Sequence, residues 1–182
     1  MNLTGQILIS LPSAPGDNFH KSVIYICAHS AEGAMGIIIN KSLKMKLYND
    51  LLKQLGIDNS RVNKILFNYG GPVETTRGFI LHSDDFIKDE SLYIDKGIAL
   101  TSSVEILQDI SKGNGPKISM LALGYAGWGP DQLEKEISNN VWMLNKAESS
   151  FIFNEDNESK WGNAYKELGF NPYLLTKNSG QA

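Results

Sequence analysis

The chain has a single cysteine, three histidines and only two arginines among its 182 residues. One cysteine cannot form an internal disulfide, so a fold held by internal disulfides is excluded. No apolar run approaches the roughly 20 residues that a membrane-spanning helix needs. Pro12 interrupts the apolar segment near the N-terminus, so we expect no targeting segment there. These absences predict a cytoplasmic protein with no membrane partner.

Recognised catalytic and nucleotide-binding motifs are missing as well. The sequence has no G-x-S-x-G nucleophile elbow, no H-E-x-x-H zinc motif and no G-x-x-x-x-G-K-[ST] phosphate loop. The formal net charge of -3 provides no large positive field, which argues against nucleic acid as a partner. A solvated helix edge explains the only basic cluster, which consists of Lys41, Lys44, Lys46 and Lys53.

What is present is an irregular succession of strand-like and helix-like segments. Strand-length, β-branched runs predict a hairpin from 21–29 and 34–41, and antiparallel pairs from 64–73 with 77–83 and from "SLYID" with "GIALT". Further strands are expected at "KISMLALGYAG" and "VWMLN". Amphipathic spacing predicts helices at 47–56, at "SSVEIL" with Ser102 and Glu105 as a capping box, at "PDQLEKEISNN" and at 159–169.

This order lacks the strict alternation of a parallel sheet and predicts an α+β fold. We expect a single compact domain over residues 1–176, in which a mixed, mainly antiparallel sheet is flanked by about four helices. Closure of the sheet into a barrel remains an alternative. Residues 177–182 are predicted to form a flexible tail.

The glycine-rich segment "LGYAGWGP" raises the question of anion binding. Pro130 suits a first helical position, which makes Gly129 a candidate N-cap with free N–H groups nearby. However, Asp131 and Glu134 already place carboxylates there and would repel a phosphate. A packing turn, with Gly127 and Gly129 as its flexible positions and Trp128 as a lid or core residue, is the favoured interpretation.

Cys27 and His29 form a C-x-H pair that a regular strand would place on one face. Zinc normally needs three or four protein ligands, so the sequence predicts no metal site and no cofactor. A redox role for Cys27 requires that His29 lower its pKa, whereas a buried thiol is usually inert. Both interpretations stay open at this stage.

Arg77 stands out because lysine is otherwise the default cation, with Arg61 as the second exception. A planar guanidinium suits a bidentate anion, which is either an internal carboxylate such as Glu74 or a bound ligand. Arg77 and His82 fall on opposite faces of a regular strand, so a joint site would require a bulge.

Three long blocks carry a family resemblance: "GQILISLPSAPGDNFHKSVIYICAHSAEGAMGIIINK", "YGGPVETTRGFILHS" and "LGYAGWGPDQLEKEISNNVWML". Together with the terminal "WGNAYKELGF", they resemble the AlgH-like family, also called YqgE, over nearly the whole chain. The resemblance implies a compact bacterial α+β domain and supplies no catalytic role. One branch of the family has the label of transcriptional regulator, although this sequence shows no helix-turn-helix with a basic recognition helix.

The leading hypothesis is a non-catalytic binding or regulatory domain for a small anionic ligand or a protein partner. It predicts a concave patch that contains at least two of Arg77, His82 and Trp128, with Gly127 and Gly129 shaping it. The alternatives are an enzyme, such as a hydrolase using His82 with Asp84 or Asp85, and a regulator that contacts DNA directly.

Overall fold

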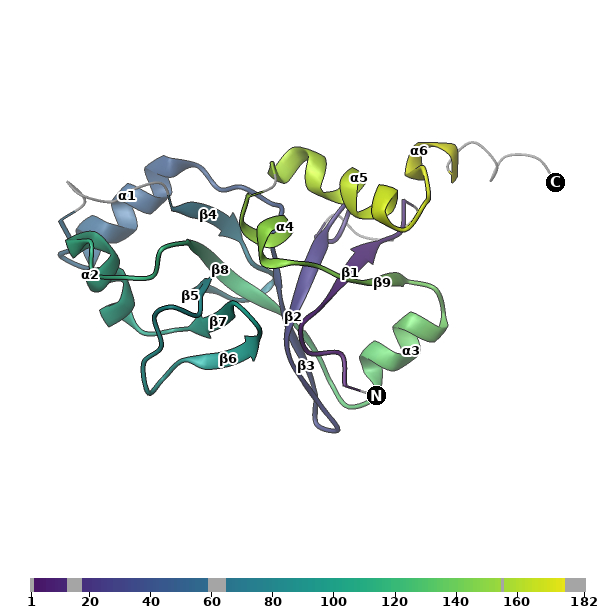
Figure 1. The fold of residues 1–182 in the computed structure, drawn as a ribbon, viewed down its shortest axis with the longest axis horizontal. Helices are drawn as coiled ribbons and strands as arrows, with labels where there is room; N and C mark the ends of the chain where they lie inside the picture. Colours follow the sequence, from purple (N-terminus) through teal and green to yellow (C-terminus); the bar gives the residue numbers. More distant parts are fainter. Residues whose placement is uncertain (1, 13–17, 59–64, 155, 176–182) are drawn as a thin grey trace.

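The computed structural model describes residues 2–12, 18–58, 65–154 and 156–175, which form nine strands and six helices (Figure 1). The strands are β1 (Gln6–Ser10), β2 (Val23–Ser30), β3 (Gly33–Ile38), β4 (Leu66–Tyr69), β5 (Val73–Ser83), β6 (Leu92–Asp95), β7 (Ile98–Thr101), β8 (Ser119–Trp128) and β9 (Trp142–Lys146). The helices are α1 (Met45–Gln54), α2 (Val104–Lys112), α3 (Gln132–Ser138), α4 (Ser149–Asn154), α5 (Asn157–Glu167) and α6 (Pro172–Leu175). None of these helices is long and apolar enough to cross a membrane. The predicted tail at 177–182 and Arg61 lie outside the described residues.

The strands form one open, mixed sheet, as the α+β prediction requires. Its order is β6-β7-β5-β8-β3-β2-β1-β9, and β4 pairs with β8 beside this path. All pairs are antiparallel except β4 with β8. Because β6 and β9 end the order, the sheet is not closed and the barrel alternative is wrong. The hairpin β2–β3 and the pair β6–β7 confirm two of the predicted antiparallel pairs.

The pleat of the sheet sorts apolar side chains into three clusters. One face carries a large core that includes Ile7, Phe79 and Leu81 and is covered by α4 and α5. On the opposite face, α3 covers a cluster around Leu8 and Ile24, while α1 and α2 cover a separate cluster around β4, β5 and β8. Figure 1 shows α1 and α2 at one end of the sheet and α3 at the other. Alternate residues of a single strand therefore belong to different cores.

The predicted pairing of 64–73 with 77–83 is wrong, because the chain crosses β8 between these two segments. β4 and β5 pair with the same stretch of β8, residues 120–123, from its opposite edges. At the crossing the backbones nearly touch: a Cβ on Gly71 would lie 2.1 Å from the carbonyl carbon of Tyr125, and one on Gly124 would lie 2.3 Å from the Gly71 carbonyl oxygen. The glycines at 71 and 124 are therefore required by the close approach of two backbones.

Two predicted helix starts are also displaced. Helix α2 has Ser103, not Ser102, at its N-cap, and no side chain caps it. Helix α3 begins two residues after Pro130, with Asp131 at the N-cap in a left-handed conformation. The prediction of about four helices missed α4 and α6, which have six and four residues and are too short to show helical periodicity. Helix α1, strand β9 and the buried face of α5 match their predictions.

Candidate functional site

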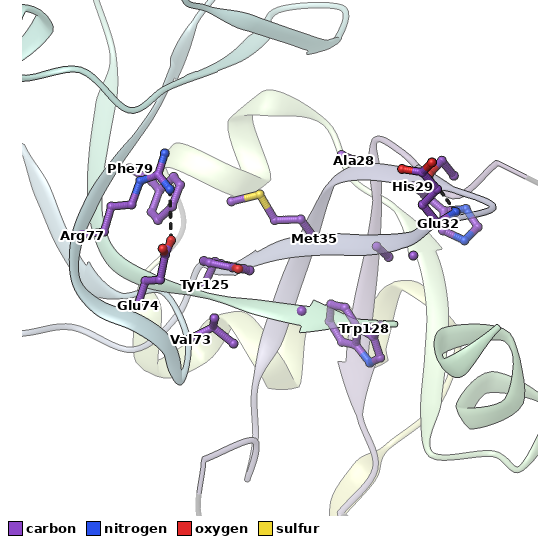
Figure 2. A pocket seen from close by; sticks show the side chains of 14 residues that line it. Ala28, His29, Glu32, Met35, Val73, Glu74, Arg77, Phe79, Tyr125 and Trp128 are labelled. Atoms are coloured by element: carbon purple, nitrogen blue, oxygen red, sulfur yellow. Dashed lines mark hydrogen bonds and ion pairs between the residues drawn. The ribbon is translucent and has the colours of Figure 1, made fainter. Parts of the chain in front are cut away.

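A shallow recess opens on the sheet between the β2–β3 hairpin and the first half of β5. We call it the open recess; its volume is about 620 Å³. Its floor is apolar and comes from β3, β5 and β8, with the side chains of Met35, Val73, Phe79 and Tyr125 lining it. Figure 2 shows Arg77 and Glu74 at one end and His29 and Glu32 at the other, with Met35 between them. Two of the three predicted residues, Arg77 and Trp128, border this recess.

Arg77 lies at the rim of the open recess with half of its side chain exposed. Its Nη1 donates to Glu74 at 3.0 Å, and Nη2 makes a longer contact of 3.4 Å with the Ser102 hydroxyl. The guanidinium also lies 5.1 Å from the centre of the Phe79 ring. The internal carboxylate named from the sequence is therefore a real partner. Because a guanidinium has five N–H donors, these contacts leave donors for another group.

Trp128 serves mainly as a core residue. Only 7% of it is exposed, and its ring packs in the cluster beneath α3. Its Nε1 donates to Glu136 at 2.9 Å, and the Nε1 of Trp142 donates to the same oxygen at 2.7 Å. Gly127 lines the floor of the open recess, whereas Gly129 does not. The segment therefore does not form the predicted turn as a whole, because β8 continues through Trp128.

The geometry gives no support to phosphate binding after Gly129. The Gly129 N–H already donates to the Gln132 side chain at 3.0 Å. Asp131 takes the N-cap position, and α3 has only seven residues. Gly124 thus serves the strand crossing and Gly127 the pairing with β3, whereas Gly129 follows β8 and donates to Gln132.

His82 lies away from the open recess and is completely buried. Its Nδ1–H donates to the Ser83 carbonyl at 2.9 Å, so the remaining nitrogen accepts from the Thr101 hydroxyl at 2.8 Å. Burial lowers the pKa of the His82 ring. Arg77 and His82 therefore do not share a site, in line with the opposite faces that the sequence assigned to them: the register shift between β5 and β8 lies before Gly78, and Gly78 to His82 alternates regularly.

The predicted pairing of His82 with Asp84 or Asp85 is not formed. Asp84 accepts the Gly97 N–H at 3.0 Å, and Asp85 accepts from the Lys117 N–H and the Ser83 hydroxyl. These carboxylates fix loops rather than orient the imidazole. His82 does contact the Thr101 hydroxyl, yet Thr101 is 1% exposed, so a substrate cannot reach this base and hydroxyl.

Cys27 and His29 face opposite sides of the sheet, so the same-face prediction is wrong. A β-bulge lies between Ile26 and Ala28, and the extra residue resets the alternation of side chains. Cys27 packs in the large core, where burial raises the pKa of its thiol far above the usual range. The geometry does not support a redox pair.

His29 instead joins the N-terminal segment to α3. Its Nδ1 accepts the Leu3 N–H at 3.1 Å, and Nε2–H donates to Glu134 at 2.8 Å. Accepting at Nδ1 requires the neutral ring. Among the described residues, no three His, Cys, Asp or Glu side chains gather as a metal site.

Sequence reasoning missed Met35, Phe79 and Tyr125, which give the open recess its apolar floor. Nothing in their spacing distinguishes them from core residues. Glu74 is different, because its φ of 47° is left-handed, a conformation that costs a non-glycine residue about 1 kcal/mol. Such strain often occurs at functional positions, but a sequence does not reveal it.

The comparisons with known proteins agree on one family. Residues 7–173 match the family model described as AlgH-like. A UPF0301 protein of Rhodopseudomonas palustris (strain BisB18) is 48% identical over 99% of this chain and 89% of its own length. A UPF0301 protein of Bradyrhizobium diazoefficiens is 46% identical over 99% of this chain and 88% of its own.

Two solved structures share the fold. The solution structure of the AlgH protein of Pseudomonas aeruginosa aligns with a TM-score of 0.80 and 35% identity, covering 100% of this chain and 97% of that one. The crystal structure of DIP2367 from Corynebacterium diphtheriae gives a TM-score of 0.72 at 20% identity, over 91% and 86% of the two chains, and so supports the fold alone. With the family model, the relatives and the fold in agreement, the chain belongs to the AlgH-like family.

Proposed function

We propose that this protein is a non-catalytic binding domain whose open recess docks an extended segment of a protein partner. The observation that carries this proposal is the apolar floor between two charged ends, which the partly buried Met35 and Tyr125 form together with the buried Phe79. Protein-binding surfaces commonly combine an apolar centre with a polar rim. Methionine suits such a site because its flexible thioether adapts to different side chains.

The charges around the open recess favour a protein segment over a small anion. Glu32 and Glu74 line it together with a single cation, Arg77. The neutral ring of His29 adds no charge, so carboxylates outnumber cations at the rim. A small anion would meet net repulsion. A segment that places an apolar side chain on the floor and a lysine or arginine beside Glu32 or Glu74 complements both features.

Strand pairing leaves room for such a segment. On its β5 side, β8 pairs last at Tyr125 with Val73, and the described residues offer no strand partner there for Gly127. The strained backbone at Glu74 holds its carboxylate toward Arg77, at the rim. An extended chain seated here would lie along the end of β8 and over Met35, where main-chain hydrogen bonds could supplement side-chain contacts.

The test is a selection of phage-displayed random peptides against the full chain, followed by affinity measurements. We expect the enriched peptides to carry an aliphatic or aromatic residue near a basic one. Met35→Glu should weaken their binding about tenfold or more, as loss of a central anchor does. The matched control is Tyr93→Glu on β6, an exposed apolar position outside the recess. Acidic peptides, or peptides that bind both variants equally, would contradict the proposal.

A second experiment addresses the native partner. A photo-crosslinking amino acid at Met35 should capture a discrete species in cells, and the same amino acid at Tyr93 should not. Glu74→Lys in the crosslinking chain should remove that species, because a lysine at the rim repels a basic segment. Capture that persists in this variant would count against the charge complementarity on which the proposal depends.

A further inference from the structure

A second pocket lies on the opposite face of the sheet, between α1 and α2. It is more enclosed than the open recess and has a volume of about 210 Å³; we call it the closed pocket. Figure 1 shows α1 and α2 near each other at the end of the sheet that carries β4, and residues of both segments line this pocket. Leucines from both helices and from β8 form the walls: Leu51, Leu55, Leu107, Leu121 and Leu123. Such a lining accepts an aliphatic group and offers no hydrogen bonds deep inside.

The mouth of the closed pocket is polar and carries a cation. Arg77, Ser102 and Ser103 line it, and the guanidinium reaches the Ser102 hydroxyl at 3.4 Å. This distance is long for a hydrogen bond, so the donor has capacity for a closer acceptor. Among the described lining residues, Arg77 is the one that the open recess and the closed pocket share.

Ser103, beside Arg77 and Ser102 in the lining, has a buried hydroxyl with no hydrogen-bond partner among the described residues. Leaving a buried polar group unpaired costs about 1–3 kcal/mol, so such groups call for an explanation. Ser103 is also the N-cap of α2, a nine-residue helix with no side chain bonded to its first N–H groups. A carboxylate bound at the mouth would lie near the positive end of this helix.

From these observations we infer that the closed pocket binds a medium-chain aliphatic carboxylate. The chain lies between the leucines of α1 and α2, and the carboxylate contacts Arg77 and the start of α2. The cavity is smaller than the roughly 300–1,000 Å³ of sites for drug-sized ligands, which favours a single aliphatic chain over a nucleotide or fused rings. Glu105, in the first turn of α2, is exposed, so solvent screens its repulsion.

The inference is independent of the partner proposed for the open recess, and it is tested with octanoate as the probe. Octanoate is titrated into the full chain with labelled leucine methyl groups, and NMR shifts are followed. We expect saturable shifts at Leu107 and Leu121. Octylammonium, which has the same chain with the opposite charge, should bind at least about tenfold more weakly, because it lacks the charge-assisted hydrogen bonds. Equal binding of octanoate and octylammonium would overturn the inference.

Variants separate the head group from the chain. Arg77→Gln should weaken octanoate binding about tenfold, which corresponds to the loss of one charged hydrogen bond. Glu74→Gln should strengthen octanoate binding, because in the wild type the Glu74 carboxylate competes with octanoate for the Arg77 guanidinium. Unchanged affinity in Arg77→Gln would overturn the assigned position of the carboxylate and with it the inference.

A third pair of variants separates the two cavities. Val104→Phe places a ring at the mouth of the closed pocket from a position that is 41% exposed, so folding should be kept while octanoate is excluded. Met35→Glu changes only the open recess and should leave octanoate binding intact. Loss of octanoate binding in Met35→Glu but not in Val104→Phe would place the ligand in the open recess and contradict the closed pocket. Peptide binding to the open recess, by contrast, should be weakened in Met35→Glu and kept in Val104→Phe.

Discussion

The corner beneath α3 and the segment that begins β5 differ in how completely their polar groups are paired. Under α3, both indole N–H groups donate to Glu136, and the imidazole of His29 uses both of its nitrogens. At the start of β5, Arg77 is half exposed, makes one short ion pair and one long contact, and borders two cavities. Trp128, which the sequence predicted as a ligand contact, and His29, which it considered as a redox partner of Cys27, are thus structural, whereas the Arg77 guanidinium keeps donors for a ligand.

Gly71→Ala should have the largest effect, because it disrupts the crossing that carries the chain into β5. The new Cβ would lie 2.1 Å from the Tyr125 backbone, and we expect a loss of about 4 kcal/mol in the free energy of unfolding, or no folding. Gly113→Ala is the matched control: its φ is +79° but no atom lies within 4 Å of the new Cβ, so it should cost only about 1 kcal/mol. Urea unfolding followed by circular dichroism measures both, and equal losses would show that backbone conformation, not the crossing, requires the glycine.

Glu136→Ala should destabilise the α3 corner by about 3 kcal/mol, since it leaves two indole N–H groups without an acceptor. Tryptophan fluorescence during urea unfolding reports on this corner directly. Glu134→Ala, on the same helix and 47% exposed in its side chain, should have a clearly smaller effect, because solvent screens its contact with His29. A Glu136 variant no less stable than the Glu134 variant would refute the role given to the two indoles.

Acid should destabilise the protein through His82. Burial lowers the pKa of its ring below the ordinary value of 6.5, so the unfolded chain binds a proton more readily than the folded chain does. The free energy of unfolding is therefore unaffected by His82 well above pH 6.5 and falls as pH drops from there toward the folded pKa. Urea unfolding at pH 7.5 and pH 5 should show this loss in the wild type and a smaller one in His82→Gln. The same slope in both proteins would assign the pH dependence to other groups.

Arg77→Gln should have the smallest effect on stability. Its ion pair with Glu74 is about half exposed on both sides, and such pairs contribute less than about 1 kcal/mol. Differential scanning calorimetry should show a melting temperature close to that of the wild type. A loss as large as that of Glu136→Ala would make Arg77 a structural residue and would remove the contrast on which both binding proposals depend.

Much of the secondary structure was predictable because hairpins and amphipathic helices are encoded by residues close together in the sequence. The hairpin turn, the leucine spacing of α1 and the buried face of α5 each depend on neighbouring residues. The crossing at Gly71 was missed because a glycine pair signals a tight turn as readily as a close approach to a distant strand. Pairing of 64–73 with 77–83 looked natural from their proximity, yet both segments pair with residues 119–125.

The candidate site was predictable only in part. The rarity of arginine pointed to Arg77, and its Glu74 partner was named correctly. Strand alternation correctly predicted that Arg77 and His82 lie on opposite faces of the sheet. The same reasoning was wrong for Cys27 and His29, because a bulge after Ile26 adds one residue and moves His29 to the other face. Met35 and the other apolar lining residues cannot be told from core residues in the sequence. The difference is that no helix or strand of the described part of the chain covers them in the folded protein, which depends on the whole fold.

The central position of β8 also sets an order of events during synthesis. Strands β3, β4 and β5 all pair with β8, which starts more than thirty residues after β5 ends. Without β8, strands β1, β2 and β3 can pair with one another, as can β5, β6 and β7, but no strand joins the two groups and β4 has no strand partner among the described residues. A chain that ends before β8 therefore leaves the edges of β3, β4 and β5 exposed to other chains, and such fragments should aggregate rather than fold.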